Sequence, residues 1–276
     1  MTKRTALSLA AALTLGIAFA APAFAQEHGT PQPPRNKWSF AGPFGTFDRA
    51  QLQRGFKVYR EVCSVCHSIE MLSFRNLAEP GGPGYSAAQA ASVASEYKIP
   101  DIDDSGQPTE RAGRPADTFP KPFANDAQAR ATHGAIPPDM SVLAKARTYE
   151  RGFPWFLLDI FTQFQEQGPD YIVALMKGYK DAPKDFQMPE ASYYNEYFPG
   201  HVLKMKPPLT DGQVTYDDGS PQTVDQYAKD VTAFLVWVAE PHMEQRKRIG
   251  LQVMIFLIVL SGLLYFTKKK VWADAH

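Results

Sequence analysis

The sequence predicts a mainly α-helical exported domain with long loop insertions, followed by one C-terminal transmembrane helix. Apolar residues recur at helical spacing over residues 52–66 and again over residues 224–238, which indicates two amphipathic helices that share a core. Residues 249–266 contain no charged side chain, and a run of this length can cross a membrane. The 23 prolines among 276 residues indicate that much of the remaining chain forms loops.

Residues 1–25 have the layout of a secretory signal peptide. A basic start precedes an apolar run, and small residues, Ala23 and Ala25, close the segment. Cleavage is expected before Gln26, with an uncleaved anchor helix as the alternative. The domain over residues 26–245 is therefore expected in the periplasm.

Residues 246–268 form the predicted membrane anchor with its basic flank. Three cations at residues 246–248 precede the uncharged run and three lysines at residues 268–270 follow it, so the positive-inside rule does not orient the helix. The signal peptide does orient it, because it exports the preceding domain and leaves residues 269–276 in the cytoplasm. We therefore expect a single-pass protein of a bacterial inner membrane. A helix buried in a soluble core is the alternative, and the cations at both ends argue against it.

The net charge of zero at neutral pH hides an acidic exported domain. Without the signal, the two basic flanks of the anchor and Asp274, 21 cationic and 28 acidic side chains remain, a net charge of about −7. This charge favours a basic soluble partner through long-range attraction, or it serves solubility alone. No nucleic-acid partner is expected.

The motif that carries chemistry is Cys63-Ser64-Val65-Cys66-His67, the C-x-x-C-H signature of covalent haem c attachment. On a helical turn, positions i, i+3 and i+4 share one face. Two thiols can then form thioethers with the two haem vinyl groups while the imidazole reaches the iron. One covalently bound haem c is therefore predicted.

Two other functions compete for the same cysteines. A thiol–disulfide oxidoreductase would place C-x-x-C where a strand leads into a helix, and no strand pattern precedes Cys63. A zinc site would need a second pair of cysteine or histidine ligands, but His28, His133, His201 and His242 are scattered and form no ligand spacing. Haem attachment in an exported protein is favoured.

The first haem-binding helix is expected over residues 46–67 and begins at Thr46 or Asp48. Its apolar face consists of Leu52, Phe56, Tyr59, Cys63 and Cys66, spaced by four, three, four and three residues. The cysteines continue this face, so the haem is expected to join the core that the helix covers.

Three methionines, Met140, Met188 and Met205, are candidates for the sixth iron ligand, since methionine opposite histidine raises the potential of a haem. Each has a proline nearby that stiffens its loop. In small cytochromes c the ligand loop precedes a final helix that packs across the first. A capping-box-like start at Thr223 and the apolar stripe over residues 224–238 fit that final helix. Met205 is nearest upstream and is favoured, while Met140 and Met188 remain open.

The rest of the domain is predicted to be mostly loop. Residues 79–133 are rich in proline, glycine and aspartate, with one short helix around residues 86–97. Residues 141–149 and 170–179 are expected to be helical, and residues 217–219 to form a hairpin turn between short strands.

A second apolar segment covers residues 151–167. We expect its stretch 153–164 to pack on another subunit or at the membrane surface, with burial inside the domain as the alternative.

Further motifs accompany C-x-x-C-H. They are Arg54-Gly55-Phe56-Lys57-Val58-Tyr59, Gly82-Pro83-Gly84-Tyr85, Gly134-Ala135-Ile136-Pro137-Pro138-Asp139-Met140-Ser141, Tyr194-Asn195-Glu196-Tyr197-Phe198-Pro199-Gly200-His201, Met205-Lys206-Pro207-Pro208 and Ala239-Glu240-Pro241. With this set in this order, the chain from residue 38 to its end resembles the cytochrome c1 family, the haem c subunits of cytochrome bc1 complexes (ubiquinol–cytochrome c reductases), in its alphaproteobacterial form. C-x-x-C-H alone would be common to all c-type cytochromes.

The resemblance implies two groups of site residues. The first binds the haem through thioethers or as axial iron ligands: Cys63 and Cys66, then His67 and Met205. The second surrounds the haem, with Pro138 packed against it, Arg147 near a propionate and Tyr171 at its edge. For Arg147, a surface position on a helix that starts at Ser141 is the alternative.

The resemblance also implies a function as a redox subunit, which is not an enzyme by itself. Such a subunit takes one electron from a Rieske iron–sulfur subunit and passes it to a soluble or anchored cytochrome c, in a dimeric complex with cytochrome b and membrane lipid. A stand-alone anchored cytochrome that shuttles electrons to an oxidase is the nearest alternative, and a thiol–disulfide oxidoreductase is a more distant one.

Overall fold

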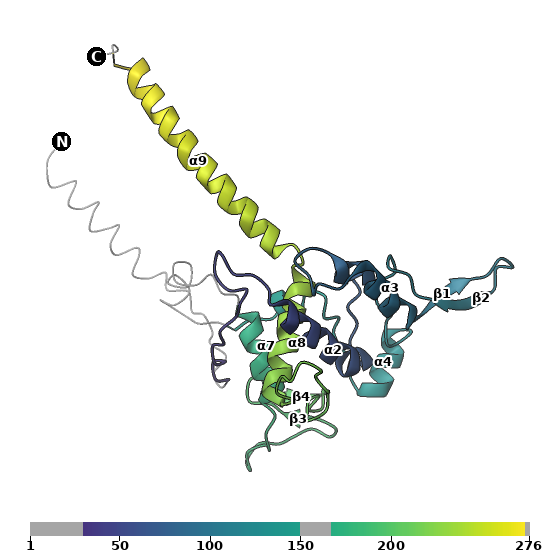
Figure 1. Cartoon of the computed structure of the whole chain (residues 1–276). Helices are drawn as coiled ribbons and strands as arrows, with labels where there is room; N and C mark the ends of the chain where they lie inside the picture. The colour runs from purple at the N-terminus through teal and green to yellow at the C-terminus, as the bar shows by residue number, and fades with distance from the viewer. Residues whose placement is uncertain (1–29, 150–166, 274–276) are drawn as a thin grey trace, which may run out of the picture.

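The computed structural model describes residues 30–149 and 167–273, and Figure 1 shows a helical domain from which one long helix projects. The predicted signal peptide over residues 1–25 and the apolar stretch 153–164 lie outside the described residues. Within the described residues the α-helices are α2 (Arg49–Glu61), α3 (Ala87–Ser95), α4 (Asp126–His133), α5 (Leu143–Ala146), α7 (Gly168–Lys177), α8 (Val224–Ala239) and α9 (Met243–Val271). Two short antiparallel pairs, β1 (Lys98–Ile102) with β2 (Pro108–Ala112) and β3 (Tyr193–Tyr194) with β4 (Val202–Leu203), complete the elements, together with 3₁₀ turns at Cys63–Val65 and Phe74–Ala78.

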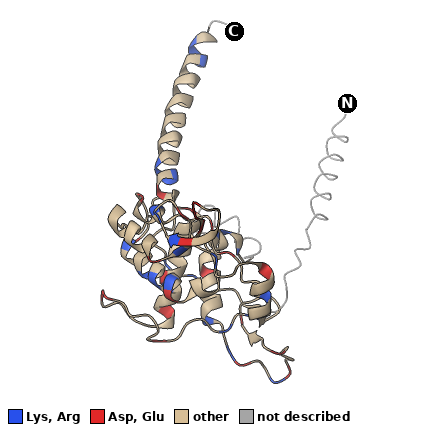
Figure 2. Cartoon of the chain, turned by 90° about the vertical axis from the view of Figure 1, so that its right-hand side faces the viewer, with Lys and Arg blue, Asp and Glu red and all other residues tan. Residues whose placement is uncertain are grey.

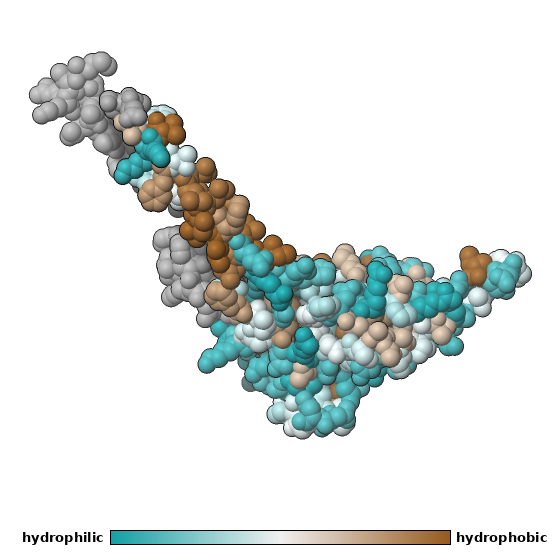
Figure 3. Space-filling model, turned by 45° about the horizontal axis from the view of Figure 1, so that its top comes forward, coloured by the Kyte–Doolittle hydropathy of each residue, from teal (hydrophilic) through white to brown (hydrophobic). Residues whose placement is uncertain are grey.

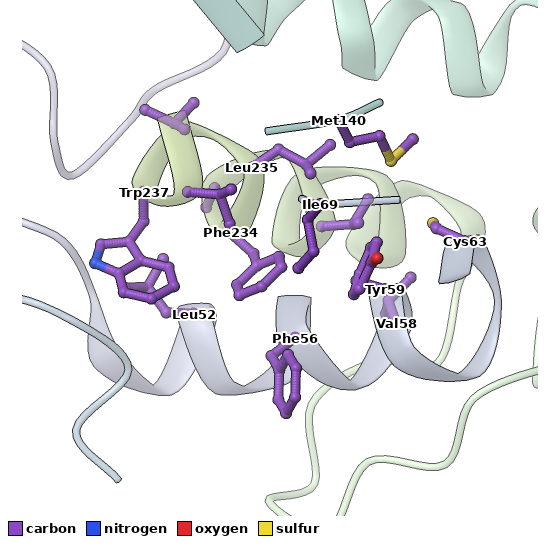
Figure 4. Packing of buried hydrophobic residues seen from close by; sticks show 14 of the residues in the cluster. Leu52, Phe56, Val58, Tyr59, Cys63, Ile69, Met140, Phe234, Leu235 and Trp237 are labelled. Carbon is purple, nitrogen blue, oxygen red and sulfur yellow. The ribbon is translucent and has the colours of Figure 1, made fainter. Parts of the chain in front are cut away.

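The core is built where α2 packs against α8 (Figure 4). A Cβ at Gly55 would lie 2.0 Å from the carbonyl oxygen of Asp230, so only glycine allows the two helices to approach this closely. The rings of Phe56 and Tyr59 lie 5.5 and 5.8 Å from the ring of Phe234, and all three side chains are almost fully buried. The predicted pairing of an early and a late amphipathic helix is confirmed.

Caps at the helix starts agree with the sequence. Asp48 begins α2 by accepting a hydrogen bond from the amide of Gln51, and Thr223 begins α8 in the same way with Gln226. The end of α2 differs from the prediction: the α-helix stops at Glu61 rather than continuing to residue 67, and a 3₁₀ turn follows.

The predicted long loop over residues 79–133 contains more structure than one helix. The β1–β2 hairpin projects from the domain (Figure 1), and Asp103 forms its turn by accepting from the Ser105 and Gln107 amides. Helix α4 follows and begins at Asn125, whose side chain accepts from the amide of Gln128. Such local side-chain-to-backbone bonds create short elements that a composition rich in proline and glycine conceals.

Two further predictions are corrected. The expected helix over residues 141–149 is only the single turn α5, because the chain is extended again from Arg147. Residues 217–219 do form a turn, but no strand flanks it in the described part of the chain, because Asp218 is held in a local turn by the amide of Ser220 and pairs with Arg54 at 2.7 Å.

Helix α9 is held firmly at its base. Glu244 accepts a hydrogen bond from the amide of Phe47 at 2.7 Å, and Lys247 donates to the carbonyl oxygens of Phe40 at 2.6 Å and Gly45 at 3.2 Å. One turn earlier, Glu240 forms ion pairs with a lysine and an arginine, Lys145 and Arg246. The helix therefore continues the domain as one rigid piece.

Beyond its base, α9 is the one helix of the described residues that is long and apolar enough to cross a membrane, with a mean hydropathy of 2.3 over its most apolar 18 residues. None of that window is buried against the domain. The 29 residues span about 43 Å, cations stand at both ends (Figure 2), and the apolar surface between them is continuous (Figure 3). This arrangement matches the predicted anchor.

Candidate functional site

The C-x-x-C-H motif forms one tight turn directly after α2. The amides of Cys66 and His67 both donate to the carbonyl oxygen of Cys63, at 3.1 and 2.9 Å. The buried hydroxyl of Tyr59 donates to the carbonyl oxygen of His67 at 3.0 Å and fixes the exit from the turn. The turn is 3₁₀ rather than the predicted α-helix, and it still aligns positions i and i+3, the two cysteines, on one side.

The imidazole of His67 is fixed by a single backbone contact. Its Nδ1 lies 2.8 Å from the carbonyl oxygen of Pro138, which can only accept, so Nδ1 carries the proton and Nε2 keeps a free lone pair. Burial lowers the pKa of His67, and the hydrogen bond to Pro138 opposes this only in part. The ring is therefore neutral at physiological pH, which is the form that binds a metal ion.

The loop that supplies Pro138 is held against the motif by the carboxylate of Asp139. This group accepts hydrogen bonds from the Ser68 hydroxyl at 2.7 Å, the Glu70 amide at 2.9 Å and the Ser141 amide at 2.8 Å. Burial acts to raise the pKa of Asp139, but these bonds outweigh it and hold the pKa below its usual range. The hydrogen bonds of Asp139 therefore hold in place the neighbouring Pro138, whose carbonyl oxygen orients His67.

The three candidate methionines occupy different environments. Met140 is 2 % exposed and lies in the apolar cluster with Ile69 and Leu235 (Figure 4), and its amide donates to the carbonyl oxygen of Ser68. Met140 follows Pro138 by two residues, so it belongs to the side of the motif that already holds the imidazole. Met188 is half-buried in the loop between α7 and β3.

Met205 is also half-buried, and its loop reaches the motif from another direction. Its carbonyl oxygen accepts a hydrogen bond from the Tyr179 hydroxyl at 3.1 Å. The neighbouring Lys206 lies close enough to Cys66 to oppose the rise in its pKa. A Cβ at Gly134 would lie 3.9 Å from the Lys204 side chain. The loop of Met205 therefore lies near Cys66 and Gly134, residues 140 and 70 positions away from Lys206 and Lys204, and the segment before Met140 also lines the cavity beside Cys66.

The two thiols are free and unactivated. Burial raises the pKa of Cys63 to about 12, with a further contribution from Cys66. Burial also raises the pKa of Cys66. Cys66 Sγ lies 3.6 Å from Nε2 of His133 at the end of α4, a contact between residues 67 positions apart. Sequence reasoning treated His133 as isolated, and no local pattern could have revealed this contact.

Arg147 and Tyr171 are brought together at one corner of the domain. A Cβ at Gly168 would lie 2.0 Å from the carbonyl oxygen of Ala144 and 2.5 Å from that of Arg147, so the end of α5 touches the start of α7. Tyr171 is 7 % exposed, and burial raises its pKa while the positive charge of Arg147 opposes the rise. The Arg147 side chain itself is exposed.

The donor set suits a haem better than a bare metal ion. One turn carries two thiols and an imidazole whose Nε2 is free, and the loop of Met205 carries a thioether nearby. Within residues 30–149 and 167–273, no three histidine, cysteine, aspartate or glutamate side chains converge to hold a metal ion.

Comparisons with known proteins agree with this chemistry. The sequence model described as "Cytochrome C1 family" matches residues 38–275. The "Cytochrome b/c1" of Bradyrhizobium diazoefficiens is 61 % identical over 274 residues, which cover 98 % of this chain and 40 % of that relative. The "Cytochrome c1" of Blastochloris viridis is 50 % identical over 99 % of this chain and 97 % of its own length. A mitochondrial "Cytochrome c1, heme protein" of Saccharomyces cerevisiae is 41 % identical over 90 % of this chain and 74 % of that protein.

Proposed function

Because this chain belongs to the cytochrome c1 family, we propose that it is the one-electron relay of a cytochrome bc1 complex, receiving an electron from the Rieske iron–sulfur subunit and passing it to a cytochrome c. The carrying observation is the imidazole of His67, which is fixed through Nδ1 by Pro138 with Nε2 free, on the same turn as both thiols. This arrangement presents both thiols and the Nε2 lone pair from one turn, as attachment and ligation of a haem would require.

One haem c is held by four residues in this proposal. Cys63 and Cys66 would form the thioethers, and His67, through Nε2, and Met205 would be the two protein ligands of the iron. When bound, the haem iron supplies a reversible ferric–ferrous couple. The place of Met205 in the loop before α8, with the neighbouring Lys206 near Cys66, supports this choice of methionine.

Three further residues shape the surroundings of the haem. The carbonyl oxygen of Pro138 keeps His67 in the ligating tautomer. Arg147 offers a cation to a propionate, and Tyr171 places a buried ring at the haem edge. The protein thereby sets the potential through ligation, burial and charge, and no acid–base step on a substrate is required.

The rigid base of α9 favours a fixed subunit over a stand-alone shuttle. A shuttle needs a flexible linker between its haem domain and its anchor. Here α8 ends at Ala239, α9 begins at Met243, and the intervening Glu240 is paired with both Lys145 and Arg246.

The thiol–disulfide oxidoreductase is the weaker candidate because such enzymes need a thiolate with a lowered pKa. Burial raises the pKa of both cysteines in this chain, and Cys63 is 8 % exposed. Buried thiols with raised pKa values suit attachment to a haem in the core better than they suit thiol–disulfide exchange.

The proposed location is a bacterial inner membrane, crossed once by α9, with the haem domain in the periplasm and the C-terminus in the cytoplasm. Cytochrome b, the Rieske subunit and lipid are the proposed neighbours, in a dimeric complex. The acidic exported domain suits a basic cytochrome c, soluble or anchored, as acceptor.

Two measurements test this function. A pyridine haemochrome spectrum of the denatured chain should show haem c that organic extraction does not remove, and a colourless chain with two titratable thiols would refute the haem assignment. Gentle solubilisation should then co-purify the chain with cytochrome b and a Rieske protein. A haem-loaded chain that purifies without either subunit would identify the shuttle instead.

A further inference from the structure

The N-terminal arm, residues 30–47, ends in a rigid turn that exposes an aromatic ring. The amide of Gly45 donates to the carbonyl oxygen of Gly42 at 3.4 Å, and the amide of Thr46 donates to that of Ser39 at 3.0 Å. Phe44 lies at the tip of this turn and is 75 % exposed. Its neighbours Phe40 and Phe47 are 6 and 7 % exposed, so the arm buries its other phenylalanines.

This turn lies beside the first turns of α9. Lys247 donates to the carbonyl oxygens of Phe40 and Gly45, on either side of the exposed ring, and Glu244 accepts from the amide of Phe47. The apolar surface of the helix begins at Ile249, which rises only about 3 Å above Lys247 along the axis. The turn that carries the ring is therefore bound to the part of α9 where the basic flank of the anchor gives way to its apolar span.

The two ends of α9 differ in their aromatic residues. Tyr265, Phe266 and Trp272 stand at the C-terminal end, where aromatic rings commonly mark the membrane–water boundary. At the other end, residues 243–255 include no aromatic side chain, and the first is Phe256, about 10 Å beyond Ile249. An aromatic ring at the periplasmic boundary has to come from another part of the chain.

We propose that Phe44 supplies that ring: it inserts into the interfacial region of the periplasmic leaflet and makes the N-terminal arm a second contact of the domain with lipid. The chemistry fits an anionic or zwitterionic phospholipid surface, because the turn that carries the exposed ring is bound by Lys247 of the basic flank. This proposal goes beyond the electron relay and requires only that α9 spans a membrane.

Two contacts with the bilayer constrain more than one does. A single helix leaves the domain free to rotate about the helix axis and to change its tilt. A ring that enters the interface beside the helix restricts the tilt of the domain towards or away from the side that carries the ring. The arm leads directly into α2, and the haem motif follows α2, so this second contact restricts the orientation of the motif relative to the membrane.

The test uses the haem-loaded full chain in phospholipid discs. In Phe44→Cys the new thiol is the one free cysteine, since both native cysteines are in thioethers, and it takes a nitroxide label. With the haem reduced, the label at position 44 should collide several-fold more often with oxygen, which concentrates in lipid, than with a water-soluble nickel chelate. Ile102→Cys is the matched control, because Ile102 is 69 % exposed on the β1 strand, far from α9 (Figure 1), and its label should prefer nickel.

A label at position 44 that is as accessible to nickel as the label at position 102 would overturn the proposal. Labelling of three thiols instead of one would point to a failed haem assignment, and the lipid contact would then be read from the fluorine signal of 4-fluorophenylalanine at position 44, which does not depend on the thiols. In the assembled complex, 4-fluorophenylalanine at position 44 keeps the ring, and dissolved oxygen should shift its fluorine signal strongly. A signal insensitive to both oxygen and nickel would mean that a protein subunit covers the ring, which also overturns the proposal.

Discussion

The two sides of the proposed haem site are built to different standards of rigidity. On the histidine side, Pro138 orients His67, and Asp139 holds the loop with three hydrogen bonds from two segments. On the methionine side, the Tyr179 hydroxyl donates to the carbonyl oxygen of Met205 at 3.1 Å, and Lys204 donates to the carbonyl oxygen of Glu190 at 2.8 Å. The comparison teaches that the proposed histidine ligand lies beside a loop held by one carboxylate with three donors, while the proposed thioether lies on a loop held by two separate contacts.

The comparison is tested most strongly at the methionine itself. Met205→Leu should leave the haem attached, because both thioethers and His67 are untouched, and should lower the midpoint potential by on the order of 100 mV, a fraction of the range that axial ligands span. Redox titration of the purified protein measures this change. Met188→Leu and Met140→Leu are the matched controls and should keep the potential. If Met188→Leu lowered it instead, the ligand would be Met188.

On the histidine side the largest effect should be on stability. Asp139→Ala removes one acceptor from three donors and should lower the free energy of unfolding by about 2–4 kcal/mol, since partly buried donors lose a charged partner. Urea unfolding followed by the haem absorbance measures it. Ser68→Ala, which removes a single donor, should cost less than half as much. Equal losses in the two variants would show that Asp139 does not organise the loop.

A smaller effect is expected at the hydrogen bond from Tyr179 to the methionine loop. Tyr179→Phe should cost only about 1 kcal/mol of stability, as one neutral hydrogen bond is lost. A more direct readout is the charge-transfer absorption band of the ferric protein that arises from the bond between the haem iron and the methionine sulfur. In Tyr179→Phe this band should disappear at lower pH than in the unaltered chain, because the loosened loop releases Met205. A band with unchanged pH dependence would show that Tyr179 contributes to core packing and does not hold the Met205 loop.

The smallest expected effect is the loss of the stabilising contribution of Asp139 at low pH. The pKa of Asp139 lies below its usual range, so its contribution to stability is fully present above its unfolded pKa of about 3.9 and is lost as the pH falls through the folded value. The difference in urea midpoint between the unaltered chain and Asp139→Asn should therefore stay constant down to about pH 4 and shrink below it. A difference that grew towards low pH would contradict the assigned direction.

The elements that could be predicted from the sequence are those set by patterns of neighbouring residues that extend over several helical turns. Helices α2 and α8 have long apolar stripes and caps at Asp48 and Thr223, so their starts and shared core were predictable from local pattern. Helix α4 and the β1–β2 hairpin were not predicted. Each depends on one short polar side chain, Asn125 or Asp103, that accepts a hydrogen bond from a backbone amide three or four residues further along the chain.

The candidate site divides in the same way. Cys63, Cys66 and His67 belong to a contiguous motif, whereas the order of Met205 over Met188 rested on position along the chain and on resemblance. The contacts that organise the site join residues far apart in sequence: Asp139 with Ser68, Tyr179 with Met205, and Cys66 with His133. No periodicity records which of many polar residues will meet across a fold.

The ion pairs and backbone contacts at the base of α9 have a consequence for distance. With Lys247 bound to the arm and Glu240 bound on both sides, these contacts fix the domain to the first turns of α9. In the proposed relay, where electron transfer requires close approach, the travel between donor and acceptor would then be made by the partners and not by this domain.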